Sequence, residues 1–533
     1  MNQRARKLRR ERIRARYGKN PLENDRFLSA KNRMDEIKIY HNEMSDTALD
    51  DISWNDLEMD EVFYRINNTN SYMGEQILYH RLHDTGTNHN WKQFEQQIEF
   101  FENHEEERIS IEEKLSYIGK REENYYMPIF MMHSEDWTIQ STFLLHLLQV
   151  LLVGFFLGSI FTENPICFAG LLCVAVTNLM VYLFTKQKYE VYLYSLGSLK
   201  QLVDFCKTMT SNPKWKEAFV SEEVEQAVLK LNKLSKKLVS FQTRKAGSLS
   251  GDMLYMLQDY IYGITLFDIA AFNYLMKAIY KKQQEVLLLY EFAGNVDMEI
   301  AVASFRKSLE VVCKPTFSEE HSIHGKGIYH PLIACAVAND FDLSSKAIIT
   351  GANASGKSTF MKALALNVVL AQTIHTCAAE SFCLPRLSVM TSMAIRDDVL
   401  TGESYYIKET KYLKRMLEQV KKNPAILCVI DEILKGTNTK ERLAASEAIL
   451  DYFAKTDSFF IVATHDLELV YGRENQYKNY YFESVVTDSD ICFDYKIHKG
   501  IGGNSNAIAL LAFLDFPKEI VTAAKKNLMR GNK

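Results

Sequence analysis

The longest apolar stretches of the chain lie side by side in its first half. No charged residue occurs between Asp136 and Glu163, and the run FLLHLLQVLLVGFFLGSIF at 143–161 is long enough for one helix across the hydrocarbon core of a membrane. A second uncharged stretch, 164–185, follows after a short turn. The pattern predicts a transmembrane hairpin over residues 137–185. A pair of buried core helices is the alternative, because such helices are also apolar all round.

The charges that flank these stretches predict their orientation. A basic run, RARKLRRERIRARYGK, occupies residues 4–19, and Lys186 and Lys188 follow the second stretch, whereas the turn carries no Lys or Arg. Positive residues concentrate on the cytoplasmic side of membrane proteins. We therefore expect a two-pass membrane protein with both termini in the cytoplasm. The basic run itself has three interpretations: contact with anionic lipid, contact with nucleic acid, or a solvated tail.

Two other patterns divide the remainder of the chain. From Tyr189 to Ser304, apolar residues recur at spacings of three and four, which predicts long amphipathic helices. Beyond residue 310, fully apolar runs end in polar residues: AIIT before residue 351, AILCVID before residue 432 and FFIVAT before residue 465. Such runs are typical of strands that are buried on both faces of a parallel sheet and carry function at their carboxyl ends. The pattern therefore predicts an α/β domain after a helical region.

The first of these runs leads into a glycine-rich loop, GANASGKST, and then into a helical pattern. In such loops the backbone wraps phosphates, a lysine reaches the outer phosphates and a serine ligates Mg²⁺. Lys357 and Ser358 are that lysine and that serine. The loop therefore predicts binding of ATP and Mg²⁺ by Gly351, Ala352, Asn353, Ala354, Ser355, Gly356, Lys357, Ser358 and Thr359.

The other two runs end in groups suited to hydrolysis. Asp431 is expected to hold Mg²⁺ together with Ser358, and Glu432 to polarise the attacking water as general base. His465 is expected to sense or stabilise the γ-phosphate, so that Glu432, His465 and Lys357 form the catalytic set. The alternative for the acidic pair is capping of the next helix. The alternative for His465 is a structural role at the strand end, which the order and spacing of the three motifs disfavour.

Composition narrows the class of protein further. With 533 residues, 47% of them hydrophobic and only 9 prolines, the chain is expected to form three or four folded, helix-rich units. A formal net charge of −4 gives no overall attraction for a polyanion. The 9 cysteines include no CxxC pair, so we expect reduced, mostly buried thiols. His321, His324 and His330 lack a metal-ligand pattern and are expected to be polar loop residues.

In order along the chain, the motifs YHPLI, VANDFDL, TGANASGKST, DDVLTGESYYIKE, VIDEILKGTNT and ATHDLEL resemble the ATPase domain of the MutS family. The resemblance covers the chain from about His330 to its end. It implies an ABC-type P-loop ATPase domain over residues 311–500. It also implies that Asn339, in VAND, lies beside the adenine, and that Ser404 and Glu409 belong to the segment between the two nucleotide motifs.

The same resemblance implies a homodimer. The stretch that follows the acidic pair resembles a family loop that reaches the nucleotide of the partner subunit, here formed by Gly436, Thr437, Asn438 and Thr439. Asn438 stands where the family usually has Ser, and Leu434 replaces a Gly, so the details of the contact between subunits depart from the family pattern. Residues 501–533 resemble the C-terminal helical dimerisation element of the family.

Upstream, residues 50–84 resemble the start of the MutS helical core. The implied organisation is a basic N-terminal arm (1–30), the first part of the helical core (31–135), the hairpin (137–185), a core and lever region (186–310), the ATPase domain (311–500) and the dimerisation element (501–533). No mismatch-reading or connector domain fits before residue 50. Mismatch recognition in the usual sense is therefore not expected.

These expectations combine into one leading hypothesis. The fold class is an α/β P-loop NTPase domain joined to an α-helical core that a transmembrane hairpin interrupts. The function is that of a membrane-anchored, MutS-like ATPase that couples Mg-ATP hydrolysis to lever movement, with DNA as the candidate partner and a relation to mismatch repair. Two alternatives remain: an ATP-driven, membrane-tethered scaffold, and an ABC-like motor that acts on a partner other than DNA. A single hairpin and the lack of an LSGGQ-like signature disfavour a transporter.

Overall fold

A computed structural model describes residues 3–23, 26–44, 49–86, 90–133, 142–232, 234, 253–352, 355–393, 405–435, 437–486, 491–502 and 516–531. The chain divides into two compact units, where its length predicted three or four. Unit 1 consists of residues 1–45, 67–80 and 92–304, and unit 2 of residues 46–66, 81–91 and 305–533. The segments of the two units therefore alternate along the chain.

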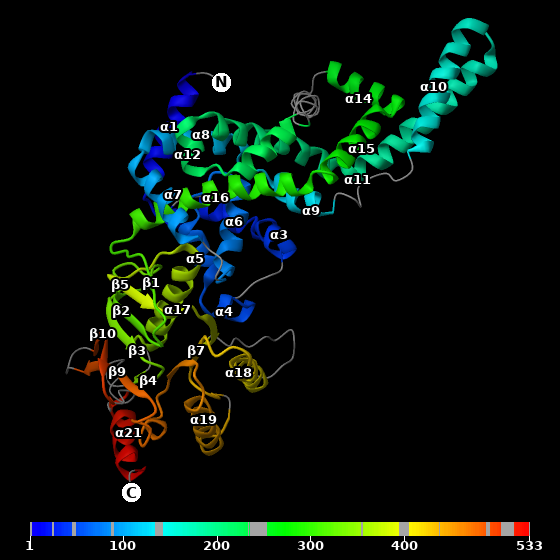
Figure 1. Ribbon diagram of the computed structural model, residues 1–533. Coiled ribbons are helices and arrows are strands. Elements are labelled where there is room, and N and C mark those ends of the chain that lie inside the picture. The colour runs from blue at the N-terminus through cyan, green and yellow to red at the C-terminus, as the bar shows by residue number, and fades with distance from the viewer. Residues whose placement is uncertain are drawn as a thin grey trace. The chain divides into compact units, whose positions relative to one another are not determined.

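Unit 1 is built from helices, drawn from blue to green in Figure 1. The helices that lie wholly or largely in it are α1 (Gln3–Arg16), η1 (Pro21–Glu23), α2 (Arg26–Lys31), α3 (Met34–Met44), α6 (Tyr72–His83), α7 (Trp91–Asn103), α8 (Glu105–Ile118), η2 (Glu122–Tyr126), α9 (Met127–Met132), α10 (Phe143–Thr162), α11 (Pro165–Ser211), α12 (Pro213–Phe219), α14 (Met253–Thr265), α15 (Phe267–Tyr280) and α16 (Gln283–Ser308).

A buried carboxylate joins two distant helices in the core of unit 1. Asp297, on α16, accepts hydrogen bonds from the backbone N–H groups of Asn70 (2.9 Å) and Ser71 (2.7 Å), directly before the start of α6. Burial raises the pKa of Asp297, against the opposing effect of these hydrogen bonds. Gly74 leaves room for the carboxylate, since a Cβ at that position would lie 2.3 Å from an oxygen of Asp297. The helix N-terminus thus receives the negative charge that it favours.

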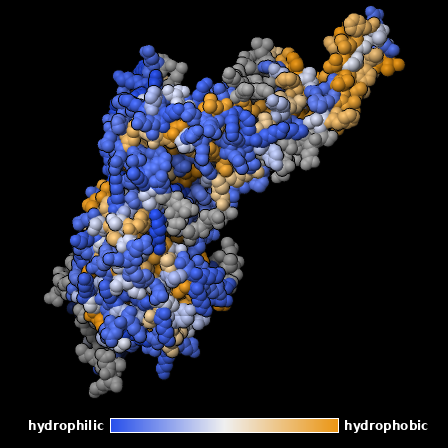
Figure 2. Space-filling view, viewed as in Figure 1, coloured by the Kyte–Doolittle hydropathy of each residue, from blue (hydrophilic) through white to orange (hydrophobic). Residues whose placement is uncertain are grey.

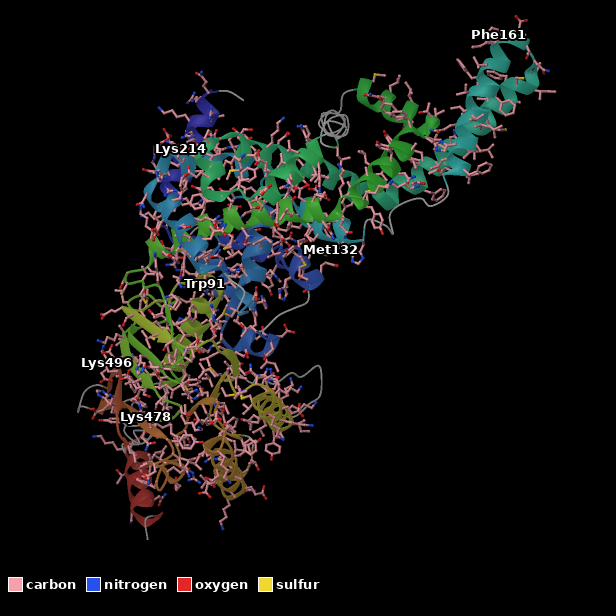
Figure 3. The ribbon with its side chains drawn as sticks, in the orientation of Figure 1. Trp91, Met132, Phe161, Lys214, Lys478 and Lys496 are labelled. Atoms are coloured by element: carbon pink, nitrogen blue, oxygen red, sulfur yellow. The ribbon has the colours of Figure 1, made fainter. Side chains whose placement is uncertain are left out.

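The two predicted apolar segments form the antiparallel helices α10 and α11, which project from the rest of unit 1 (Figure 1). Phe143–Thr162 and Pro165–Thr185 are each long and apolar enough to cross a membrane, and only 6% and 11% of them is buried. Figure 2 shows their outer surface as hydrophobic, and Figure 3 shows Phe161 at the tip. This exposure argues against the buried-core alternative. The predicted boundary at residue 185 is no structural break, because α11 continues without interruption to Ser211.

Two polar side chains of the hairpin donate hydrogen bonds where it meets the body of unit 1. The amide nitrogen of Gln149 donates to the carbonyl of Thr265 (3.0 Å), and that of Asn178 donates to the carbonyl of Ile264 (2.7 Å). These carbonyls are available because the helix breaks between α14 and α15, where Leu266 has a φ of 51°. The base of the hairpin is therefore held by specific hydrogen bonds as well as by apolar packing.

The basic run near the N-terminus is the helix α1 and is not a free arm. On one of its faces, Arg6 pairs with Glu113 of α8 at 2.7 Å, and Arg10 pairs with Glu113 at 3.0 Å and with Glu106 at 2.8 Å. Arg14 pairs with Glu106 as well. The interpretation as a solvated tail is therefore wrong, because the acidic face of α8 neutralises half of the charge on α1 within the fold.

Unit 2 contains two sheets. The larger has the order β10-β9-β4-β8-β7-β6, in which only the β9–β10 pair is antiparallel, and the smaller has the order β1-β5-β2-β3. The strands are β1 (Thr316–Phe317), β2 (Ile323–Ile328), β3 (Asn339–Leu343), β4 (Lys346–Gly351), β5 (Ser381–Leu384), β6 (Ser388–Ser392), β7 (Ile426–Asp431), β8 (Phe459–Ala463), β9 (Lys478–Val486) and β10 (Ile491–Lys499).

Helices cover these sheets. The apolar α17 contacts strands of both sheets and is almost entirely buried. The described helices of unit 2 are α4 (Asp51–Asp56), α5 (Met59–Ile66), α17 (Lys357–Ile374), α18 (Tyr405–Lys422), α19 (Thr439–Ala454), η3 (Leu467–Leu469) and α21 (Lys518–Gly531).

The outer edge of the larger sheet is closed by side chains from a distant part of the sequence. Asp56 accepts hydrogen bonds from the hydroxyl of Thr391 (2.7 Å) and the backbone N–H of Met393 (2.9 Å), and Ser53 accepts from the backbone N–H of Thr391 (3.0 Å). An edge strand with unpaired backbone groups is otherwise open to pairing with other chains. The predicted first part of the helical core thus contributes α4 to the unit that holds the β-sheets.

Two expectations about individual side chains are wrong. The described cysteines are free thiols, but only Cys206, Cys377 and Cys428 are buried, and Cys173 and Cys335 are exposed. The three histidines are not alike: His324 lies on β2 and pairs with Asp342, whereas His330 is buried. Residue type and local sequence do not reveal which strand or cavity wall covers a side chain.

Candidate active site

Three neighbouring parallel strands bring the three sequence motifs together. β4 pairs with β8, and β8 pairs with β7. The glycine-rich loop follows β4, the acidic pair ends β7, and His465 follows β8. Since the strands run in the same direction, their carboxyl ends meet at one edge of the sheet, which is where parallel sheets place ligand sites.

The glycine-rich loop needs its glycines for two different reasons. Gly351 has a φ of 143°, and a Cβ there would lie 2.8 Å from the carbonyl oxygen of Phe482. Gly356 has a φ of 105° and lies against the ring of Tyr495. Both conformations are strained for any residue with a side chain. Asn353 and Ala354, which we assigned to the same loop, lie outside the described residues.

The hydrogen bonding of two side chains of the loop indicates a site for an added acceptor. The Nζ of Lys357 donates hydrogen bonds to the carbonyls of Gly351 (2.7 Å) and Ala352 (2.9 Å). Burial lowers the pKa of Lys357, against the opposing effect of Asp431 and then of Glu432. The hydroxyl of Ser355 is buried and has no hydrogen-bond partner among the described residues. A buried hydroxyl without a partner is unfavourable, so this loop is better suited to an added acceptor such as a phosphate oxygen.

A hydrogen bond joins the first motif to the second. The hydroxyl of Ser358 donates to Oδ2 of Asp431 at 2.7 Å, although 73 positions separate the two residues. A hydroxyl and a carboxylate are hard oxygen ligands, and Mg²⁺ in phosphate sites takes only one or two protein ligands besides water and phosphate. The described residues contain no group of three or more His, Cys, Asp or Glu side chains that could hold a metal by themselves. The Ser358–Asp431 pair therefore fits Mg²⁺ bound with a nucleotide.

Glu432 is held in an unusual conformation beside His465. Its φ is 66°, in the left-handed region, and its backbone N–H donates to the carbonyl of Ala463 (3.0 Å). Its Oε1 lies 3.0 Å from Nδ1 of His465, a side chain that is 45% exposed. Left-handed backbone at a residue other than glycine costs about 1–3 kcal/mol and is concentrated at functional sites. The strain places this carboxylate at the open edge of the sheet.

Lys435 is a part of the site that the sequence motifs did not identify. Its Nζ lies 3.7 Å from Oε2 of Glu432 and 4.0 Å from Oδ2 of Asp431. The backbone N–H of Lys435 donates to the buried carboxylate of Glu409 (3.0 Å), a residue that we placed in the segment between the nucleotide motifs. Ser404, from the same segment, lies outside the described residues.

A cavity of about 270 Å³ opens beside the glycine-rich loop. Its walls come from β2, β3, α17 and β10 and from the segment between β2 and β3, and they consist of Ile328, Tyr329, His330, Ile333, Cys335, Ala336, Val337, Asn339, Gly356, Thr359, Phe360, Ala363 and Tyr495. Gly356 and Thr359 belong to the predicted phosphate loop. A mostly apolar cavity that adjoins a phosphate loop is suited to a planar base.

Asn339 shapes this cavity through bonds within the protein. Its amide nitrogen donates to the carbonyls of Val337 (3.2 Å) and Tyr495 (3.0 Å), and its Oδ1 accepts from the backbone N–H of Ile497 (2.8 Å). The side chain thus fixes β10 and the ring of Tyr495 against the cavity, while it remains part of the cavity wall. Tyr495 itself has no recognisable motif in the sequence and is placed only by the pairing of distant strands.

The loop that we expected to cross to a partner subunit precedes α19. Asn438 is the N-cap of this helix, and its side chain accepts a hydrogen bond from the backbone N–H of Glu441 (3.0 Å). Asparagine and serine are about equally good N-caps, so the departure from the family residue keeps the local structure. Thr437 and Thr439 flank the cap, and Gly436 lies outside the described residues.

Comparison with known proteins gives the relationships of this chain. The family described as MutS domain V matches residues 347–530. A DNA mismatch repair protein MutS from Shouchella clausii is 29% identical over 274 residues, which cover 48% of this chain and 31% of that protein. The corresponding protein from Listeria welshimeri is 30% identical over 230 residues, which cover 40% of this chain and 26% of that protein. The chain thus matches less than a third of the length of these relatives.

Proposed function

We propose that this chain, which belongs to the MutS family, binds and hydrolyses Mg-ATP at the edge of the sheet where β4, β7 and β8 end. The observation that carries the proposal is the 2.7 Å hydrogen bond between Ser358 and Asp431, which unites the two motifs that a nucleotide-bound metal needs. MutS domain V is an ATPase domain with mixed α/β sheets, and the matched region, residues 347–530, holds the glycine-rich loop, the acidic pair and His465, whereas Asn339 and the cavity residues before it lie outside that region.

Each part of the nucleotide has residues that fit it. The apolar cavity beside Asn339 would hold the adenine, and the loop Gly351–Thr359 would hold the phosphates, with Lys357 turning from the loop carbonyls to the outer phosphates. Ser358 and Asp431 would hold Mg²⁺. The bound Mg-ATP supplies the phosphoryl group that water attacks.

Side chains of the chain then remove one proton from the attacking water. Glu432 accepts a proton from the attacking water as general base, and His465 holds the carboxylate of Glu432 through its Nδ1. The ammonium of Lys435 lies 3.7 Å from Glu432. Its positive charge would stabilise the negative charge that develops during hydrolysis. Lys357 stabilises the charge on the outer phosphates.

We place a second copy of the chain at this site. The N-terminus of α19 is exposed at Asn438 and Thr439, so its loop can reach the phosphates of a partner subunit. A helix N-terminus attracts negative charge, which suits a contact with the γ-phosphate across a homodimer. The C-terminal helix α21 is the proposed second part of the dimer contact. Ile520 on this helix and Phe516 just before the helix are exposed.

The hairpin is the proposed membrane anchor. Its most exposed side chains are large and apolar: Phe143, Phe161 and Phe184 are 73%, 80% and 76% exposed. An apolar surface of this extent is unfavourable in water and marks a contact with lipid or protein. We propose a two-pass protein with both termini and the ATPase domain in the cytoplasm, in which the nucleotide cycle moves the helices of unit 1.

The proposed partner to test first is DNA, the substrate that the names of the relatives give. Detergent-solubilised protein would be titrated with homoduplex, mismatched and branched DNA, with and without ATP, across a salt series. Tight binding to one form that responds to ATP supports a DNA-handling role. Binding that is weak and lost with salt for every form indicates a motor or scaffold whose partner is not DNA.

The nucleotide site is tested by a matched pair of lysine substitutions on α17. Lys357→Ala should reduce the affinity for a fluorescent ATP analogue at least about tenfold, because a charge-assisted contact to phosphate is lost. Lys362→Ala is the control: Lys362 lies on the same helix but pairs with Glu58. Equal affinity in the Lys357→Ala variant and the wild type would contradict the proposed site.

A further inference from the structure

A second cavity lies entirely within unit 1 and shares no residue with the candidate active site. Its volume is about 510 Å³, within the range typical of small-molecule sites. Helices α1, α2, α6 and α8 and the segments that follow α2, α5 and α8 border it. Its walls consist of Arg9, Arg12, Ile13, Arg16, Ser29, Arg33, Asn67, Asn70, Glu75, Ser116, Gly119 and Lys120. Basic and neutral polar side chains predominate in these walls.

The lining of this cavity carries an excess of positive charge. Arg9, Arg12, Arg16, Arg33 and Lys120 face a single acidic residue, Glu75. Glu75 already binds two of them: its Oε1 lies 2.9 Å from Arg33 and 2.6 Å from Lys120. Burial disfavours the charged form of Glu75, but Lys120 and Arg33 outweigh it and lower its pKa to about 2. Arg16 pairs separately with Glu112 at 3.0 Å, so Arg9 and Arg12 are the lining arginines of α1 that show no ion pair among the described residues.

The excess comes from one face of α1. Arg6, Arg10 and Arg14 recur at every fourth position and pair with the carboxylates of α8. Arg9, Arg12 and Arg16 lie on another face of the helix, at spacings of three and four, and line the cavity. On this second face, Arg16 also ties α1 to α8, through Glu112. The second face brings like charges together, which is unfavourable unless an anion joins them.

The arginines of the second face differ in their hydrogen-bond partners. Arg16 donates to Asn70 (2.6 Å) and to Glu112 (3.0 Å). Arg9 has only a long contact of 3.4 Å with the hydroxyl of Ser116, and its guanidinium lies 4.3 Å from the ring centre of Tyr117. The side chain of Arg12 has no partner among the described residues. Arg9 and Arg12 therefore have N–H donors that can bind a ligand.

We propose that this cavity binds a small, soluble polyanion that carries two or more phosphate groups. Arginine presents a rigid fork of donors that matches phosphate oxygens, and the guanidinium groups of Arg9 and Arg12, on successive turns of α1, can bind adjacent phosphates. Asn67, Asn70 and Ser116 complete the wall, and their side chains hydrogen-bond within the protein. A cavity of about 510 Å³ is of a size for a compact molecule.

Binding is tested with inorganic tripolyphosphate by isothermal titration calorimetry at fixed ionic strength. The protein is the full chain in detergent, with Lys357→Ala to weaken phosphate binding at the candidate active site. In this background, Arg12→Gln should weaken tripolyphosphate at least about tenfold, the loss of one charge-assisted contact. Arg14→Gln is the matched control, because Arg14 lies on the same helix, pairs at the surface with Glu106, and faces away from the cavity.

Three results would overturn the proposal: no tripolyphosphate binding in the Lys357→Ala background, equal weakening by Arg12→Gln and Arg14→Gln, or capture only by vesicles containing phosphatidic acid or by duplex DNA. The last result would identify α1 as a membrane or DNA contact. Nucleotide binding by the chain with intact Lys357 is measured in parallel, so that failure of this cavity is distinguished from failure of the proposed ATPase site.

Discussion

The Nδ1 atom of His465 lies 3.0 Å from Oε1 of Glu432, across the ends of the neighbouring strands β8 and β7. The backbone of Glu432 is fixed as well, by its hydrogen bond to the carbonyl of Ala463. The carboxylate is thus held from two directions and does not depend on the nucleotide for its position. His465 is therefore proposed to orient the general base, in addition to the expected role of sensing the γ-phosphate.

The role of Glu432 as general base predicts a separation of binding from turnover. Glu432→Gln keeps the shape of the side chain but cannot accept the proton, so ATP hydrolysis should fall by about 100-fold or more. The affinity for the ATP analogue should stay within about twofold. Steady-state phosphate release and fluorescent-nucleotide titration measure the two quantities. Glu418→Gln, on the exposed face of α18, is the control, and unchanged hydrolysis in Glu432→Gln would remove Glu432 from the mechanism.

The buried contact between Asp56 and the edge of β6 predicts a loss of stability. Asp56→Ala leaves the backbone N–H of Met393 and the hydroxyl of Thr391 buried without their acceptor, which should cost about 1–3 kcal/mol. The midpoint of thermal unfolding of the full chain in detergent should fall by several degrees. Asp51→Ala, at an exposed position of α4, should leave the midpoint unchanged. Equal midpoints for the two variants would show that the edge contact contributes little.

The burial of His330 predicts a dependence of stability on pH. Burial lowers the pKa of His330 from 6.5 to about 4, and Lys362 adds to this against the opposing effect of Glu58. Between these pH values the unfolded chain binds more protons than the folded chain, so stability is full above pH 6.5 and falls as the pH drops toward 4. The loss approaches about 3 kcal/mol at the low end.

His330→Gln should flatten this part of the pH profile, because the titrating group is gone. Urea unfolding followed by tryptophan fluorescence at pH 7.0, 6.0 and 5.0 measures the slope for the variant and the wild type. His324→Gln, at an exposed position of β2, should leave the slope unchanged. Identical slopes for the wild type and His330→Gln would show that another group governs the decline.

The exposed hairpin predicts integral membrane association. After a wash in alkaline carbonate, which removes peripheral proteins, the full chain should remain in the membrane pellet. Deletion of residues 137–185 should release the protein into the supernatant with its nucleotide affinity intact, since none of the site residues lies in that segment. Release of the undeleted chain by the wash would contradict a membrane-spanning hairpin.

The sequence could predict the features that depend on local pattern. A strand, a glycine-rich loop and a helix are consecutive in the sequence, so the positions of Lys357 and Ser358 could be predicted with their neighbours. Asp431 follows from the apolar strand that it ends. The apolar helices of the hairpin could be predicted from the absence of charge alone.

The features that the sequence could not predict depend on residues far apart. Arg6 and Glu113 are 107 positions apart, and nothing in the basic run indicates that an acidic helix of the same chain neutralises it. Tyr495 reaches the cavity only because β10 lies at the end of the larger sheet next to β3. Residue 56 lies in a helical region by its pattern, yet it completes a strand that begins more than 300 positions later.

The unbroken course of α11 also has a mechanical consequence. A helix of 47 residues is about 70 Å long. No loop interrupts it between the hairpin and Ser211. The second helix of the hairpin and the segment that packs inside unit 1 are therefore parts of one continuous helix. In a bilayer, the tilt of the hairpin would set the angle at which unit 1 stands over the membrane surface. A change in bilayer thickness that tilts the hairpin would act on unit 1 through the continuous backbone of α11.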